Sequence, residues 1–224
     1  AARYLSNEYG KGILLGGIAG QPPAKVMIIG AGTVGEAAAK SALALGASVQ
    51  VFDDNIYRLS RLQNDLGNKI YTSVIDPINL AKNISRAHVV IGALKPKNGK
   101  TPRVVTEDMV RSMKKDSVII DVSIDQGGCF ETSVVTNHNE PVYTKHGVIH
   151  YCVPNMPGVV PRTSTYALTN VTLKYGSMLA AMGVEDAVAK DRHLMKGLNV
   201  YNGYVCYEPV ARDLGMEFKP YKPA

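Results

Sequence analysis

Short apolar runs alternate with helix-like segments over most of the chain. An apolar run of about four to eight residues, bounded by turn residues, is typical of a strand buried on both faces. The segments between them open with helix-start residues or repeat apolar positions every three or four residues, as helices do. The runs that predict strands are 25–30, 47–53, 68–74, 88–94, 116–124 and 147–153. The segments that predict helices are 33–46, 55–67, 77–87 and 106–115.

Strands that alternate with helices over short loops predict βαβ units in a mostly parallel sheet with right-handed crossovers. The predicted fold class is therefore α/β, a Rossmann-type doubly wound parallel sheet with C-terminal helices. We expect a glycine-rich linker over 1–24, followed by the Rossmann domain over 25–160. The pattern then changes to a long helix with Thr163 or Ser164 as its N-cap, which makes 161–224 a C-terminal helical segment.

Composition narrows the class of protein. The 224 residues are 46% hydrophobic and 20% charged, which is typical of a globular chain. The net charge of +6 comes from scattered lysines and arginines with no basic run, so we expect no nucleic-acid partner. No apolar run approaches the ~20 residues of a membrane helix, so we expect no membrane partner. Three separated cysteines without a C-x-x-C motif indicate free thiols and a cytoplasmic location.

A glycine motif follows the first predicted strand. The stretch "GAGTVG" places Gly30, Gly32 and Gly35 in a G-x-G-x-x-G pattern that opens a predicted helix around Thr33 and Val34. In such a turn the first glycine permits the tight bend and the second lets a pyrophosphate approach the backbone. The third glycine allows helix and strand to pack closely. The phosphates would then meet the positive end of the helix.

An aspartate ends the second predicted strand, in the neighbourhood where a dinucleotide's ribose is bound. The carboxylate of Asp53 would accept hydrogen bonds from both hydroxyls of the adenosine ribose, and with Asp54 it would repel a 2′-phosphate. NAD is therefore favoured over NADP. Two alternatives stay open: a flavin, or a structural glycine turn with a helix-capping aspartate.

Three further loops are expected at the same edge of the sheet, because ligands of such folds lie beyond the carboxyl ends of the strands. They are "GALKPKNGK", "IDQGG" and "PNMPGVVPRT". In the second loop, Gly127 and Gly128 allow close backbone approach and Asp125 offers a charge near the reacting ring. Asp125 could also be a plain turn residue, since Asp-x-Gly-Gly is ordinary turn chemistry.

The histidines and cysteines indicate neither a metal site nor a nucleophile. His146 and His150 are four residues apart, but the strand pattern around Gly147 would separate them by about 13 Å. The other histidines, at 88, 138 and 193, are expected to be structural or solvated. Nothing in the sequence activates Cys129 as a nucleophile.

Two long stretches resemble the alanine dehydrogenases. They are "IDQGGCFE" with "YCVPNMPGVVPRTSTYALTN", and "LLGGIAGQPPAKVMIIGAGTVGEAAAKSALALGASVQVFDDN". The similarity covers essentially the whole chain. The NAD-binding portion of the proton-translocating transhydrogenases is related, but it usually carries a glutamate before the glycines of "IDQGG". Cys129 and the 163–165 segment also favour the dehydrogenases.

The resemblance implies reversible, NAD-dependent oxidative deamination of L-alanine to pyruvate and ammonium, by hexamers of two-domain subunits. It implies that the glycine loop binds the cofactor's pyrophosphate together with Thr33 and Val34, that Asp53 binds the ribose, and that Asp125 is the active-site aspartate. It implies that the remaining cofactor contacts are Arg58, Leu94, Val122, Val153, Asn155 and Met156.

The chain also departs from the family. The N-terminal domain that supplies a substrate-binding lysine and histidine is absent, and the helices from Thr163 onward would pack on that domain. The chain, which begins without a methionine, therefore resembles the second half of the enzyme, expected to bind dinucleotide with little turnover alone. Lys95 and Lys97 stand where the family tends to be apolar. The alternative function is an NAD-binding module of a transhydrogenase-like assembly, or a regulatory dinucleotide-binding domain.

Overall fold

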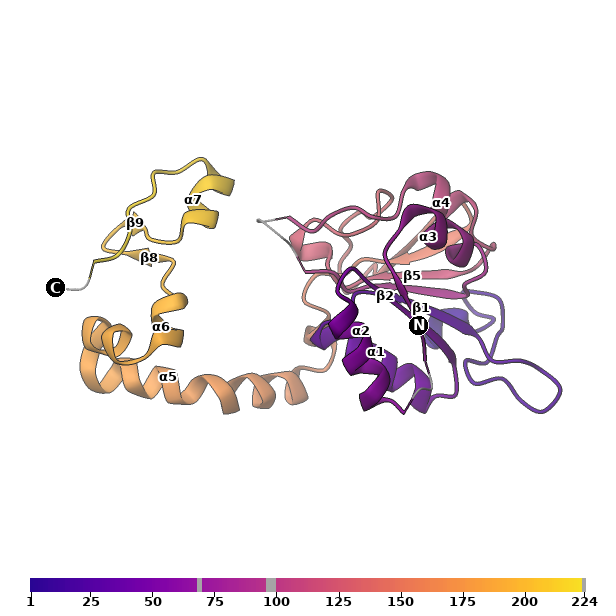
Figure 1. Ribbon diagram of the computed structural model, residues 1–224, viewed down its shortest axis with the longest axis horizontal. Coiled ribbons are helices and arrows are strands. Elements are labelled where there is room, and N and C mark those ends of the chain that lie inside the picture. The colour runs from indigo at the N-terminus through magenta and orange to yellow at the C-terminus, as the bar shows by residue number, and fades with distance from the viewer. Residues whose placement is uncertain (68–69, 96–99, 223–224) are drawn as a thin grey trace. The chain divides into compact units, whose positions relative to one another are not determined.

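The computed structural model describes residues 1–67, 70–95 and 100–222, and it divides into two compact units. The first unit comprises Ala1–Met156 and the second Pro157–Ala224. Figure 1 labels the helices and strands of both units.

A seven-stranded sheet forms the centre of the first unit, in the order β3-β2-β1-β4-β5-β7-β6. All strands pair in parallel except β6, which pairs with β7 in antiparallel fashion at the sheet's edge. Their bounds are β1 Lys25–Ile29, β2 Ser48–Asp53, β3 Tyr71–Val74, β4 Val89–Gly92, β5 Val118–Asp121, β6 Val142–Lys145 and β7 Val148–Tyr151. The strand order reverses between β1 and β4, so the predicted doubly wound sheet is confirmed; β6 was not predicted.

Helices cover both faces of this sheet (Figure 1). On one face lie α1 (Thr33–Ala44) and α2 (Ile56–Asp65), and on the other lie α3 (Pro77–Ile84) and α4 (Glu107–Arg111). The alternation along β1 explains the two layers. Val26 and Ile28 belong to the core cluster that contains residues of α1 and α2, and Met27 and Ile29 to the cluster that contains residues of α3 and α4. A central strand buried on both faces reads as a continuous apolar run.

Side-chain caps set the starts of three of these helices. Asn55 accepts a hydrogen bond from the backbone N–H of Arg58, and Thr106 accepts one from that of Met109. Asp76 accepts from two N–H groups of α3, with Pro77 at the first helical position as predicted. Because these caps are local, each of the three helices begins in the loop that follows a strand.

Residues 1–24 pack against the sheet as part of the first unit. The short helix η1 (Arg3–Leu5) contributes Leu5, which is fully buried, and Leu15 is 6% exposed in the same core cluster as Val26. The segment was predicted as a linker, and its glycines do produce irregular backbone. Its apolar residues, however, pack in the core on the α1 face of the sheet.

The second unit is mostly helical. It contains α5 (Pro161–Lys190), α6 (Arg192–Lys196), a hairpin of β8 (Val200–Tyr201) with β9 (Tyr204–Val205), and α7 (Glu208–Leu214). The predicted caps Thr163 and Ser164 were wrong, because Pro161 is already the first helical residue of α5. Gly183 interrupts α5 with a φ of 77°. Among the described residues, no helix has the length and hydropathy to cross a bilayer.

The core of the first unit generates a stability prediction. Ile28 is 0% exposed in β1, whereas Ile56 is 66% exposed on α2. Ile28→Ala should lower the free energy of unfolding by about 2–5 kcal/mol, because it leaves a cavity between sheet and helix. The matched control Ile56→Ala should change it by less than about 0.5 kcal/mol. Urea denaturation followed by circular dichroism measures both, and equal effects would contradict the assigned core.

Candidate functional site

Gly30 and Gly35 are required by close packing at the end of β1. Gly30 has a φ of +113°, and a Cβ built on it would lie 2.4 Å from the carbonyl oxygen of Ala93, in the chain that leaves β4. A Cβ on Gly35 would lie 1.8 Å from the carbonyl oxygen of Gly30. Both distances exclude a side chain. The turn, the crossing chain and α1 therefore meet at the point where strand order reverses.

Gly32 differs from the other two glycines, because its missing side chain leaves open space. It is the N-cap of α1 in extended backbone, and apart from its own neighbours in the chain no described residue comes within 4 Å of a Cβ built there. No described side chain caps this helix, so its first N–H groups are left to water or a ligand. Thr33 is exposed and Val34 is 47% exposed at this helix start. The loop has the form of an anion cradle.

Asp53 lies beneath the glycine loop and holds it. Its Oδ2 accepts a hydrogen bond of 2.7 Å from the backbone N–H of Ala31, and its Oδ1 accepts one of 2.8 Å from Asn55. The residue is 2% exposed, and each carboxylate oxygen keeps a second lone pair. The cap of α2 is Asn55, so the open alternative of a helix-capping aspartate does not describe Asp53. Arg58 Nη1 lies 3.8 Å from Asp53 Oδ2, and the Arg58 side chain is about half exposed.

Leu94 and Val122 continue the site along the carboxyl edge of the sheet. The Val122 N–H donates to the Gly92 carbonyl at 2.9 Å, and the Ser123 hydroxyl donates to the Leu94 carbonyl at 2.8 Å. Leu94 and Val122 are both half-buried. The chains leaving β4 and β5 are thus tied together beside the glycine loop.

Asp125 lies exposed on a short 3-10 helix, η2 (Ile124–Gln126), just beyond β5. Gly127 follows with a φ of 100° and open space where its Cβ would be. Gly128 has a φ of 70°, and a Cβ there would lie 2.5 Å from the Asp121 carboxylate. The loop therefore presents Asp125 outward, while Gly128 packs it against the end of the strand.

Asp121 supports this loop and was missed by the sequence analysis. Its carboxylate is fully buried and accepts hydrogen bonds from the backbone N–H groups of Ser123 and Cys129 and from the Ser133 hydroxyl, at 3.1, 3.0 and 2.6 Å. Burial raises the pKa of Asp121, and these donors oppose the rise. Burial, with the neighbouring Asp121 carboxylate, raises the pKa of the Cys129 thiol well above its ordinary value, as expected for an unreactive core cysteine.

Val153, Asn155 and Met156 complete the edge beyond β7. The register pairs Ile120 with Tyr151, so the chain leaves the sheet at Val153 beside Val122. Val153 is 1% exposed and Asn155 is exposed, with a φ of 51°. Asparagine tolerates this left-handed backbone better than most residues. Of the predicted lysines in the loop after β4, Lys95 is exposed and Lys97 lies outside the described residues.

Three of the five histidines have structural partners for their side chains. His88, at the amino end of β4, accepts a hydrogen bond of 2.9 Å from the Lys25 N–H. His146 lies in the turn between β6 and β7, and its Nε2 is 2.6 Å from Glu107 Oε1. His150 is fully buried in β7, between the Val148 carbonyl and the Thr132 hydroxyl. Within the described ranges, no three potential ligands are placed to hold a metal ion.

Together these features define a class of protein. A doubly wound sheet with a glycine loop at its switch point, an uncapped helix start and a carboxylate ending β2 is the architecture of a dinucleotide-binding domain. The family model "Alanine dehydrogenase/PNT, C-terminal domain" matches residues 1–208. The chain belongs to this family.

Individual relatives agree. The chain is 50% identical to the alanine dehydrogenase of Bacillus subtilis over 96% of this chain and 57% of that protein. A solved structure of an L-alanine dehydrogenase matches with a TM-score of 0.88 and 42% identity, covering 96% of this chain and 59% of that one. A transhydrogenase structure from Sinorhizobium meliloti matches with a TM-score of 0.54 and 28% identity over 62% of this chain and 41% of that one. The chain spans somewhat more than half the length of the dehydrogenases.

The glycine geometry predicts opposite outcomes at two positions. Gly35→Ala should lower the free energy of unfolding by about 1–3 kcal/mol or more, because its Cβ meets backbone that cannot yield easily. Gly32→Ala should cause no loss, because the position is open and its backbone suits alanine. Differential scanning calorimetry compares the two variants. A stable Gly35→Ala would show that helix and turn are less tightly packed than described.

His150 predicts a pH dependence of stability. Burial lowers the pKa of His150 to about 4, so the folded chain keeps it neutral while the unfolded chain takes up a proton near 6.5. Its contribution to stability is therefore complete above pH ~6.5 and is lost as the pH falls from ~6.5 to ~4, on the order of 3 kcal/mol in all. His150→Gln should flatten that part of the profile, measured by urea midpoints. The exposed control His138→Gln should follow the wild type, and a His150→Gln profile parallel to both would contradict the assignment.

Proposed function

We propose that this chain is the NAD-binding part of an L-alanine dehydrogenase. The reaction is L-alanine + NAD⁺ + H₂O → pyruvate + NH₄⁺ + NADH + H⁺. The observation that carries the proposal is the glycine loop held over Asp53 at the switch point, in a chain half identical to an alanine dehydrogenase. The transhydrogenase-like alternative has weaker support, since that structure is 28% identical over 62% of this chain.

The adenosine half of NAD would lie over β1 and β2. Phosphate oxygens fit the open space at Gly32 and the free N–H groups of α1. Asp53 has lone pairs left for the ribose hydroxyls, and the exposed Asp54 beside it adds the negative charge that disfavours a 2′-phosphate. Arg58 flanks the adenosine end.

The nicotinamide half would lie over β4, β5 and β7. Leu94, Val122, Val153, Asn155 and Met156 would line it, with Val153 contributing through its backbone because its side chain is buried. Bound NAD supplies the hydride acceptor for the substrate Cα. Asp125 stands exposed at that end, where its carboxylate can orient the substrate amine and take part in proton transfer during imine hydrolysis.

The substrate side of the proposal extends beyond this chain. The resemblance assigns a lysine and a histidine of an N-terminal domain to the substrate's carboxylate and carbonyl, and the relatives are longer than the matched region. We expect this chain alone to bind NAD with little turnover. We also propose a homo-oligomer, hexameric in the intact enzyme, in the cytoplasm. Support comes from exposed apolar residues on α5 and from cysteines that are all free in the described residues.

Substitutions of Asp53 and Asp125 should affect NAD binding to different extents. Asp53→Ala should weaken NAD binding at least about tenfold, since a hydrogen bond to a charged group is worth roughly 1.5–3 kcal/mol. The neighbouring control Asp54→Ala should change it less. Asp125→Asn should spare most of the binding. Isothermal titration calorimetry with NADH measures all three, and equal losses at Asp53 and Asp125 would overturn the assigned roles.

The reaction itself is tested by joining this chain to the N-terminal part of the Bacillus subtilis relative. The joined protein should form NADH from L-alanine and NAD, and Asp125→Asn should abolish most of that activity while calorimetry still shows NADH binding. NADH binding without any alanine-dependent NADH formation would favour the binding-module alternative.

A further inference from the structure

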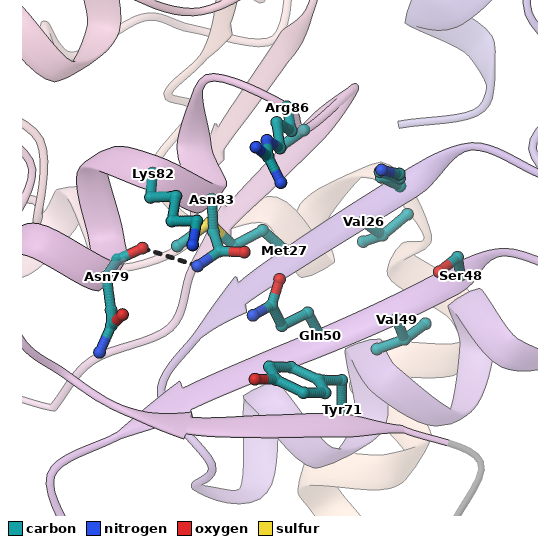
Figure 2. Close-up of a pocket in the computed structure, with 12 residues that line it drawn as sticks. Val26, Met27, Ser48, Val49, Gln50, Tyr71, Asn79, Lys82, Asn83 and Arg86 are labelled. Atoms are coloured by element: carbon teal, nitrogen blue, oxygen red, sulfur yellow. Dashed lines mark hydrogen bonds between the residues drawn. The ribbon is translucent and has the colours of Figure 1, made fainter.

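A groove of about 400 Å³ lies on the α3 face of the sheet, at the amino ends of β1, β2 and β3 (Figure 2). It is distinct from the glycine loop, which follows the carboxyl end of β1. Its size falls within the range of small-molecule pockets. The residues lining it are Lys25, Val26, Met27, Ser48, Val49, Gln50, Tyr71, Asn79, Lys82, Asn83, Arg86 and Ala87.

Two polar residues, Gln50 and Tyr71, lie beside the apolar Met27 on the strand face that floors this groove, where a doubly wound sheet is normally apolar. On β2, Val49 and Val51 point to the α1 face and are buried, whereas Gln50 lies on the α3 face beside Met27 of β1. The register pairs Gln50 with Tyr71 of β3, which is 66% exposed. A strand covered by helices on both faces carries apolar residues throughout. Polar residues here indicate an occupant other than a helix of this unit.

The charges around the groove have one sign. Lys25 comes from β1, Lys82 and Arg86 come from α3, and none of the described residues that line the groove is acidic. Among the residues that the structure describes, none of these three forms an ion pair. The carboxyl-terminal turn of α3 attracts cations by its dipole, which accounts for Lys82. The helix dipole does not account for Lys25, which lies on β1.

The Gln50 amide adds an unsatisfied donor. Its Nε2 is buried and has no hydrogen-bond partner in the described part of the chain. Figure 2 shows Gln50 rising from the strands toward Lys82 and Asn83 on the α3 side. The Asn83 amide N–H donates to the Asn79 carbonyl at 2.8 Å, and no oxygen of the described residues accepts from Gln50 Nε2. Because the amide can turn about its last torsion, Nε2 can be offered to an acceptor in the groove.

We propose that this groove binds a small phosphorylated metabolite. Lys25, Lys82 and Arg86 would pair with phosphate oxygens, and the Gln50 amide would donate to one of them. Three cations and an unpartnered amide donor match the charge and the acceptors of a phosphate group. The volume exceeds that of one phosphate, which leaves room for the organic part against Tyr71.

Pyrophosphate is the probe for this site, titrated calorimetrically into the full chain at low ionic strength. The glycine loop could also bind it, so the titration is repeated with saturating NADH. Binding at one site should persist in NADH, and Lys82→Ala/Arg86→Ala should weaken it at least about tenfold, since both lost contacts are charge-assisted. The control pair Lys174→Ala/Lys190→Ala on α5 removes the same charge and should weaken it less than about twofold.

A second variant keeps the test independent of folding. Gln50→Leu should weaken pyrophosphate binding while leaving the melting temperature unchanged or higher, because it removes an unsatisfied buried amide. Equal weakening by both lysine-containing pairs, or binding that NADH abolishes and Lys82→Ala/Arg86→Ala leaves intact, would overturn the proposal. The absence of pyrophosphate binding would also overturn the proposal. If Lys82→Ala/Arg86→Ala then changed the sedimentation of the chain, the groove would instead be covered by a second copy.

Discussion

The close contact between Gly35 and the Gly30 carbonyl is the constraint on which the rest of the first unit depends. Since a Cβ at Gly35 would lie 1.8 Å from that oxygen, α1 can start directly over the end of β1 only with glycine there. Gly30 in turn lies against Ala93, so the chain that leaves β4 passes close to the same turn. This packing places the uncapped start of α1 directly beyond the end of β1, at the switch point of the sheet. Without it, the glycine loop could not take this form.

Two buried carboxylates then hold the loops of that edge, by the same chemistry. Asp53 ends β2 and accepts the N–H of Ala31; Asp121 ends β5 and accepts the N–H groups of Ser123 and Cys129. A carboxylate hydrogen-bonded by backbone donors fixes a loop more firmly than a neutral acceptor does. Each keeps the backbone of a loop at the carboxyl edge of the sheet in place. The second of these loops presents Asp125 to solvent.

How much of this arrangement the sequence could predict depends on how far along the chain each sequence signal acts. Apolar runs and caps are local, so the parallel strands, Pro77 at the start of α3 and the reversal of strand order were predictable. The edge strand β6 was missed because its burial is only partial along Val142–Lys145. Asp121 was missed for a different reason. Its partners Cys129 and Ser133 lie eight and twelve residues away, and no spacing rule connects them.

The second unit does not bury the large apolar side chains of its long helix α5. Among its described residues the large apolar side chains of α5 are open to solvent, with Tyr166, Leu168 and Leu173 exposed by 64%, 62% and 70%. Its buried apolar residues among those described are few and small, namely Ala187, Val188, Val205 and Ala211. Ordering a chain costs about 1–2 kcal/mol per residue, and so little burial cannot offset that cost in a unit of this size. The exposed apolar side chains of α5 therefore form a surface that the second unit does not bury by itself.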